Sequence, residues 1–127
     1  MTTFEIKYDK SNVHARFTQA GHNLPILTPV YHDGTSWIKA KVDSDSTVAT
    51  ALVVRVVDVD TIDAGFSGIY NVGTHSLTLG KYYFTSDLVS GVLSETNSEL
   101  SNPIVQVITA QEIRVLEYRP MRYSLGY

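Results

Sequence analysis

Four histidines are the residues whose chemistry would most easily bind a metal or move a proton. They are His14, His22, His32 and His75, and they lie far apart in the chain. Zinc sites use closely spaced His or Cys pairs, and the chain contains no cysteine. His22 differs from the others because it lies in a loop rich in Gly and Pro. We expect histidines that are exposed or hydrogen-bonded for structural reasons, and no metal site.

The acidic stretch "DVDTID" contains Asp58, Asp60 and Asp63. The first two share a face if the strand continues through them. Calcium needs six to eight oxygen ligands, and its loops also carry a glycine turn and a bidentate acid. The stretch lacks these elements, so a solvated strand end is the favoured interpretation and a calcium site is the alternative.

Serine chemistry has little support in the sequence. No serine stands in the Gly-x-Ser-x-Gly pattern, and glycine-rich phosphate loops are absent. A carboxylate pair for glycoside hydrolysis is left open by the sequence, although a small domain offers little room for a deep cleft. We therefore expect no enzyme and no cofactor.

The stretch "GKYYFTSDLVSGVLSE" suggests either an aromatic stacking site or a strand that leads into a turn. Alternation along a strand places Tyr82 and Phe84 on one face, which we assign to the core. Tyr83 then points outward, where it would meet a neighbouring subunit. Asp87 follows the strand and is expected to accept hydrogen bonds that close the turn.

Most of the chain has the pattern of β-structure. Apolar runs are short, rich in β-branched residues and bounded by turn residues. Asp33 and Gly34 predict a hairpin turn, and residues 43–50 predict a polar linker with one helical turn. Strands are predicted at residues 4–8, 13–17, 30–42, 51–60, 103–109 and 113–118, with 51–60 as a central strand. The fold class is all-β, a compact antiparallel β-sandwich or β-barrel with extended terminal arms.

Length and charge exclude several classes of partner. The chain has 127 residues, of which 43% are hydrophobic and 18% charged, with a formal net charge of −3. This predicts one domain over residues 1–127. No cluster of Lys and Arg is present, so nucleic acid is not an expected partner. No apolar run suits a signal peptide or a membrane span, so we expect synthesis in a host cytoplasm and no membrane contact.

Three stretches resemble a β-rich domain of tailed-phage virion proteins, found in tail fibres and small capsid-associated proteins. They are "TQAGHNLPILTPVYHDGTSWIKAKVDS", "LTLGKYYFTSDLVSGVLSET" and "NPIVQVITAQEIRVLEYRP", which together span residues 18–120. The matching positions are Gly21-His22, Trp37 to Ala40, Leu77 to Tyr83, Ser86-Asp87 with Gly91, and Val115 to Arg119. The chain departs from the pattern at Val92, where a second glycine is common, and in its first 17 and last seven residues.

The resemblance implies a non-enzymatic structural protein of the virion. A short chain favours a capsid decoration or cement protein on the capsid surface, bound to the major capsid protein or other virion proteins. It also implies a homotrimer. The alternative is a tail-fibre or receptor-binding module that recognises a host surface glycan.

Both ends of the chain are candidate contact segments. Residues 1–12 would form an arm that adds a strand to an exposed sheet edge of a neighbour. Residues 121–127 form a tail rich in Tyr and Arg, a composition common at interfaces. The candidate interface residues are Phe4, Ile6, Tyr8, Tyr83, Arg119, Met121, Arg122, Tyr123 and Tyr127.

Overall fold

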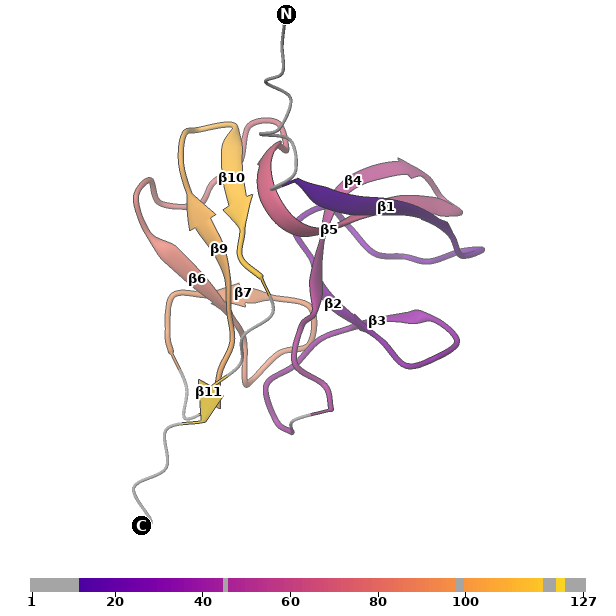
Figure 1. The fold of residues 1–127 in the computed structure, drawn as a ribbon, viewed down its shortest axis with the longest axis horizontal. Coiled ribbons are helices and arrows are strands. Elements are labelled where there is room, and N and C mark those ends of the chain that lie inside the picture. Colours follow the sequence, from indigo (N-terminus) through magenta and orange to yellow (C-terminus); the bar gives the residue numbers. More distant parts are fainter. Residues whose placement is uncertain (1–11, 45, 98–99, 118–120, 123–127) are drawn as a thin grey trace, which may run out of the picture.

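The computed structural model describes residues 12–44, 46–97, 100–117 and 121–122. These residues form an all-β fold, as the sequence predicts (Figure 1). They contain no helix long and apolar enough to cross a membrane. The strands are β1 (Val13–Thr18), β2 (Pro29–His32), β3 (Trp37–Lys39), β4 (Ala51–Asp58), β5 (Thr61–Asn71), β6 (Tyr82–Thr85), β7 (Leu93–Ser94), β8 (Leu100–Ser101), β9 (Pro103–Val107), β10 (Glu112–Val115) and β11 (Met121–Arg122).

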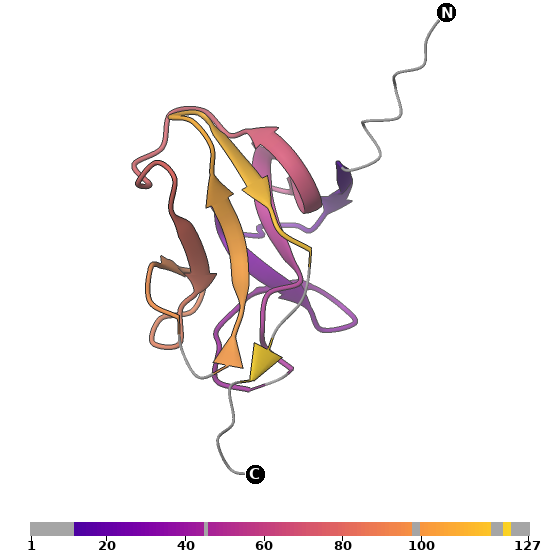
Figure 2. The ribbon, with the colours of Figure 1, turned by 60° about the vertical axis from the view of Figure 1, so that its left-hand side comes forward.

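One antiparallel sheet curls into a half-barrel. Its strand order is β3-β2-β4-β5-β10-β9-β6-β7, with β1 paired to β5 outside this path. Figure 2 shows β9 and β10 side by side, with β6 along the other edge of β9. A separate short ribbon joins β8 and β11. The predicted hairpin at Asp33-Gly34 connects β2 to β3, and Asp33 Oδ1 accepts the backbone N–H groups of Thr35 and Ser36 at 2.8 Å. These bonds lower the pKa of Asp33 below its usual value.

The long strand β5 connects the two halves of the molecule. Its first residues pair with β4, and its last four residues pair with β10. Gly68 is the first residue of the pairing with β10, opposite Val115, and it has φ +107°, a conformation that favours glycine. A Cβ atom at Gly68 would lie 2.5 Å from the Cα of Asn12. The change of partner therefore occurs at a position that only glycine fits.

Hydrogen bonds between distant segments close the curl. Gly91 N–H donates to Ala40 O at 2.8 Å, and Val42 N–H donates to Ser86 O at 2.9 Å. Gly91 has φ +75°, and its Cβ position lies 2.8 Å from the side chain of Lys39. These contacts hold the end of β3 against the turn that follows β6, so this turn has a fixed position on the framework.

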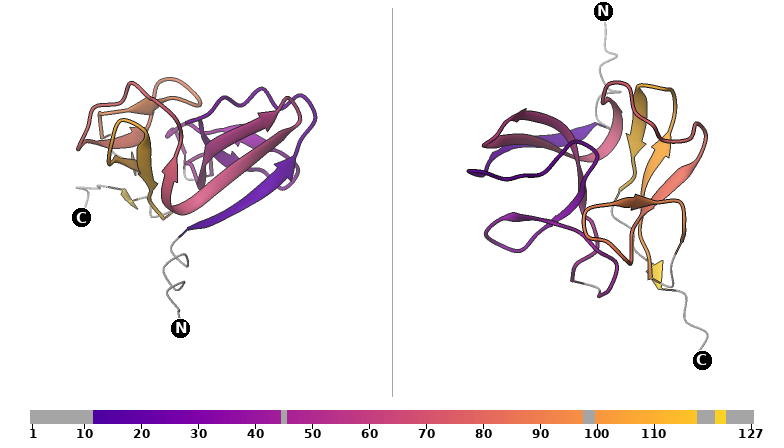
Figure 3. Two further views of the ribbon diagram at one scale, coloured as in Figure 1. Left: turned by 90° about the horizontal axis from the view of Figure 1, so that it is seen from above. Right: turned by 180° about the vertical axis from the view of Figure 1, so that it is seen from behind.

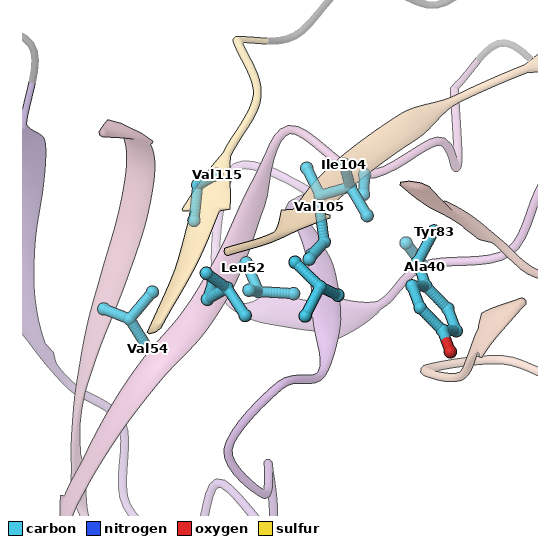
Figure 4. Close-up of a cluster of buried hydrophobic side chains, with 10 residues drawn as sticks. Ala40, Leu52, Val54, Tyr83, Ile104, Val105 and Val115 are labelled. Carbon is cyan, nitrogen blue, oxygen red and sulfur yellow. The ribbon is translucent and has the colours of Figure 1, made fainter. Parts of the chain in front are cut away.

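The two larger clusters of the core lie on the two faces of β4. A third, smaller cluster contains Val42, Val48 and Leu100. Leu52 and Val54 face a cluster that includes Ile104, Val105 and Val115, in the concave side of the half-barrel (Figure 4). Alternate residues of β4 face a second cluster that contains Trp37, Val30 and Ile62. Burial on both faces explains why residues 51–54 are all apolar, and it confirms the prediction of a central strand. From Arg55 onward the side chains of β4 are exposed.

The prediction for Tyr82 and Tyr83 is wrong. Tyr83 is buried at 6% exposure, whereas Tyr82 is 49% exposed. The reason is the register of β6 with β9, because Tyr83 lies opposite Val105 and both side chains face the core (Figure 4). Alternation correctly separated the two tyrosines but did not show which face was inward.

Two local predictions also need correction. Within residues 43–50, which we expected to include a helical turn, the described residues 43–44 and 46–50 form turns and bends. The turn after β6 is closed by Ser86 and not by Asp87, because Ser86 Oγ accepts the N–H groups of Leu88 and Val89 at 3.0 Å each. We expected a short side-chain acceptor at the end of the strand, but assigned this role to Asp87 and not to Ser86.

A buried amide joins segments that are distant in sequence. Asn102, 1% exposed, accepts the N–H of Ala49 at 2.7 Å and the hydroxyl of Thr85 at 2.6 Å through its Oδ1. Its backbone carbonyl also accepts the N–H of Thr85. The side chain thus satisfies two donors that the fold hides from water.

We predict that Asn102→Ala lowers the free energy of unfolding by about 2–4 kcal/mol, because it leaves two buried donors without an acceptor. Chemical denaturation monitored by Trp37 fluorescence measures this loss. The matched control is Asn71→Ala, which removes an exposed amide that accepts Gly73 N–H. Equal effects of the two substitutions would show that the buried network does not matter.

Candidate interaction surface

The ring nitrogens of two histidines are fully used in backbone hydrogen bonds. His22 Nδ1 accepts Leu24 N–H at 2.9 Å, so the proton lies on Nε2, which donates to Asp58 O at 2.8 Å. His75 repeats this arrangement with Leu77 N–H at 3.1 Å and Thr109 O at 2.8 Å. Neither ring has a free nitrogen for a metal or a substrate. His22 fixes its loop to the end of β4, and His75 fixes its loop to the turn between β9 and β10.

The remaining histidines pack against aromatic rings. His32 lies edge-on to Trp37 with ring centroids 5.0 Å apart, and its Nδ1 accepts Gly34 N–H at 3.0 Å. His14 lies edge-on to Tyr70 at 5.9 Å. Burial raises the pKa of the Tyr70 phenol, which donates to backbone carbonyls. Structural roles account for these contacts.

The acidic residues near the β4–β5 turn do not converge on one point. Asp58 Oδ1 accepts Asp60 N–H and Asp60 Oδ1 accepts Gly21 N–H, each at 2.9 Å. Asp63 lies on β5 and pairs with Arg16. In the described part of the chain, no group of three or more His, Cys, Asp or Glu side chains is placed to hold a metal ion.

The hydroxyl of Tyr83 organises a polar cluster at the rim of the core. It accepts Thr78 N–H and donates to Glu95 Oε2, at 3.0 Å in both cases. Glu95 Oε1 also lies 3.8 Å from Lys81 Nζ. This cluster fixes the approach to β6 against β7, and Tyr83 contributes to it from within the fold.

The turn at residues 87–92, which we name the apolar turn, exposes three aliphatic side chains. Leu88 is 80% exposed, Val89 55% and Val92 43%. Its backbone is held at both ends, by Ser86 Oγ at the start and by the bond from Gly91 to Ala40 near the end. Exposed aliphatic side chains on a fixed backbone lose little conformational freedom when a partner covers them. The apolar turn is therefore the strongest candidate contact surface among the described residues.

A second apolar surface lies between the loop after β1 and the β4–β5 hairpin. It is an open cleft of about 530 Å³, lined by residues 21–25 together with Val56, Asp58 and Val59. His22 and Asp60 fix the loop that forms one wall. The lining is mainly apolar and holds no convergent set of polar groups, which gives it little capacity for catalysis.

The structure describes three of the candidate interface residues, Tyr83, Met121 and Arg122. Tyr83 is buried, which excludes it as an exposed contact. Met121 and Arg122 form β11, opposite Ser101 and Leu100 of β8. Phe4, Ile6, Tyr8, Arg119, Tyr123 and Tyr127 lie outside the described residues. The apolar turn was missed, although adjacent Leu and Val between polar turn residues gave a signal for it.

We compared the chain with protein-family models, curated proteins and solved structures. No protein-family model, curated protein or solved structure matches this chain.

The ion pair between Arg16 and Asp63 joins β1 to β5. Arg16 Nε lies 2.8 Å from Asp63 Oδ1, and its Nη2 lies 3.1 Å from Oδ2. The carboxylate is buried and the guanidinium is half exposed. The hydrogen bond from Arg16 lowers the pKa of Asp63, and burial opposes this effect only in part.

This lowered pKa makes stability depend on pH in the acid range. Because folded Asp63 binds a proton less readily than in the unfolded chain, its contribution is complete above the unfolded pKa and is lost as pH falls through the folded pKa. We predict that Asp63→Asn lowers the melting temperature near pH 7 and makes it fall less steeply below about pH 4. Thermal unfolding between pH 2 and pH 7 measures both effects. The control is the same substitution at the exposed Asp87, and a wild-type slope in Asp63→Asn would contradict the prediction.

Proposed function

We propose that the protein is a non-enzymatic structural protein of a tailed-phage virion, a decoration protein that binds and stabilises the assembled capsid. Its partner is the major capsid protein or another virion protein, and its assembly state is a homotrimer. The support is the set of stretches that resemble virion β-domains, carried by the Gly-His loop, the Trp-x-x-Ala segment and the Tyr-Tyr strand.

The positions that carry the resemblance have architectural roles in this fold. His22 ties its loop to β4, Trp37 fills the second core cluster, and Tyr83 fills the first. Gly91 closes the half-barrel against Lys39. The resemblance therefore concerns the scaffold, and contacts with a partner must come from exposed residues between these positions.

The apolar turn is the observation that supports a structural role best. Its three aliphatic side chains are exposed on a backbone that the closure of the half-barrel holds in place. Full burial of one such side chain is worth about 1.5–3 kcal/mol. A capsid offers many equivalent sites, so modest contacts from each copy of an oligomer combine into tight binding.

One observation favours the alternative of a fibre module that binds a glycan. The ring of Tyr82 is exposed on the outer face of β6, where it could stack on a sugar. Binding on a glycan array that disappears in Tyr82→Ala would favour this alternative. An array without signal would count against it.

We predict that Leu88→Asp weakens binding to capsids that lack the protein by at least about tenfold, because a charge would be buried at the contact. Co-sedimentation with purified capsids measures this binding. The melting temperature should stay unchanged, since Leu88 is exposed in the free protein.

The matched control is Leu79→Asp, which changes an exposed leucine before β6 and away from the apolar turn. It should bind as the wild type does. Equal binding by all three proteins would exclude the apolar turn as the contact. Failure of the wild type to bind capsids, together with its absence from purified virions by mass spectrometry, would refute the proposed function.

A further inference from the structure

The strand β1 has one edge without a partner among the described residues. β1 pairs with β5, and Gln19 N–H continues this ladder by donating to Asp60 O. Antiparallel partners alternate between bonded and non-bonded pairs. The backbone groups of Ala15 and Phe17 therefore face β5, and those of His14, Arg16 and Thr18 face away. Figure 3 shows β1 along the outer side of β5.

The outer edge of β3 is partly covered by a side chain that follows β1. The side chain of Gln19 accepts Trp37 N–H at 2.7 Å and donates to Trp37 O at 3.1 Å. It thus replaces a neighbouring strand for one residue of β3. β1 has no such substitute on its outer edge within the described residues, and an open edge is a template for strand addition.

The chain itself carries a segment that fits this edge. Eleven residues precede Asn12, and among them residues 4–8 alternate apolar and polar side chains. We propose that residues 3–8 bind as an antiparallel strand along the outer edge of β1, connected to it by a turn at residues 9–12. This proposal is independent of the capsid role.

One register matches the two segments on both faces. With Tyr8 opposite Val13, the apolar residues of the segment lie opposite the apolar residues of β1, and Glu5 lies opposite Arg16. A shift by one residue would place Glu5 and Lys7 on the apolar face, so the register is well specified. The opposed pairs are Tyr8 with Val13, Ile6 with Ala15, Phe4 with Phe17, Lys7 with His14, Glu5 with Arg16 and Thr3 with Thr18.

The apolar face of β1 has room for these side chains. Val13 is 51% exposed, and Phe17 is half-buried against Trp37 with ring centroids 5.1 Å apart. Phe66 also packs half-buried against this cluster. In the proposed register Phe4 extends the aromatic cluster next to Phe17, and burial of its ring supplies the main driving force.

On the polar face of the proposed pair of strands, Arg16 can donate hydrogen bonds to the carboxylate of Glu5. Arg16 uses Nε and Nη2 to bind Asp63, and among the described residues Nη1 has no hydrogen-bond partner. A guanidinium has five N–H donors, so it can bind a second carboxylate at the same time. Glu5 in the proposed register supplies that carboxylate.

The connection favours the same chain over a second copy. Asp9, Lys10, Ser11 and Asn12 form a short link of which three residues are common in turns. Asn12 is fixed at the start of β1, because its side chain bonds both the N–H and the carbonyl of Ile69. A short link to an anchored residue gives the segment a high effective concentration at its own edge.

A designed disulfide tests the register. The chain lacks cysteine, so the double variant Ile6→Cys, Ala15→Cys offers a single possible pair within one chain. Directly opposed residues of a non-bonded pair have Cβ atoms about 4.5–5.5 Å apart, which is close enough for a disulfide after small adjustment. We expect oxidation in air to give a monomer with an internal disulfide on non-reducing gels. In the control Glu5→Cys, Ala15→Cys, the two side chains lie on opposite faces and should not join.

Hydrogen exchange gives a second test that needs no disulfide. In the full chain, the amide of Arg16 should be protected from exchange although it faces away from β5. Glu5→Pro removes the N–H opposite Arg16 and should increase the exchange rate of that amide by at least tenfold. Thr2→Pro, outside the paired segment, should leave it unchanged.

Three results would overturn the proposal. They are a failure of the Ile6, Ala15 pair to cross-link, a cross-link that forms only between two chains, and an Arg16 amide that exchanges at the unprotected rate in the wild type. The second result would show that copies of the protein exchange their N-terminal segments. Capsid binding by the apolar turn is measured separately, so the two proposals can fail independently.

Discussion

The fold depends on β5, a strand that has different partners at its two ends. Its first part completes a sheet with β4 and β1, and its last part joins β10 and the strands beyond it. The pairing with β10 begins at Gly68, a glycine that allows close approach of Asn12. A side chain at this point would separate the two halves or displace the start of β1.

Local patterns predicted the elements of this fold well, and they failed where tertiary contacts decide. The Asp-Gly hairpin and the central strand follow from turn chemistry and from a run of β-branched residues. Alternation also separated Tyr82 from Tyr83, but the choice of inward face depends on the register with β9, which no local pattern encodes. The switch of partners along β5 is likewise set by contacts between residues far apart in sequence.

The same distinction applies to the candidate site. Among the residues that first suggested chemistry, His22 and Asp60 bind backbone groups and Asp63 binds a single arginine, which the sequence predicted only in general terms. The apolar turn was not predicted, because its adjacent Leu and Val do not show by themselves that distant contacts fix the backbone that carries them.

The separation of β1 and β5 along the chain has a consequence for biosynthesis. β1 is translated first, but its partner strand emerges only after β2, β3 and β4. Until then β1 has no strand to pair with, and its backbone groups remain open to other partners. Slow translation between Thr18 and Thr61 would prolong this interval, so codon choice in that part of the coding sequence would influence the yield of soluble protein.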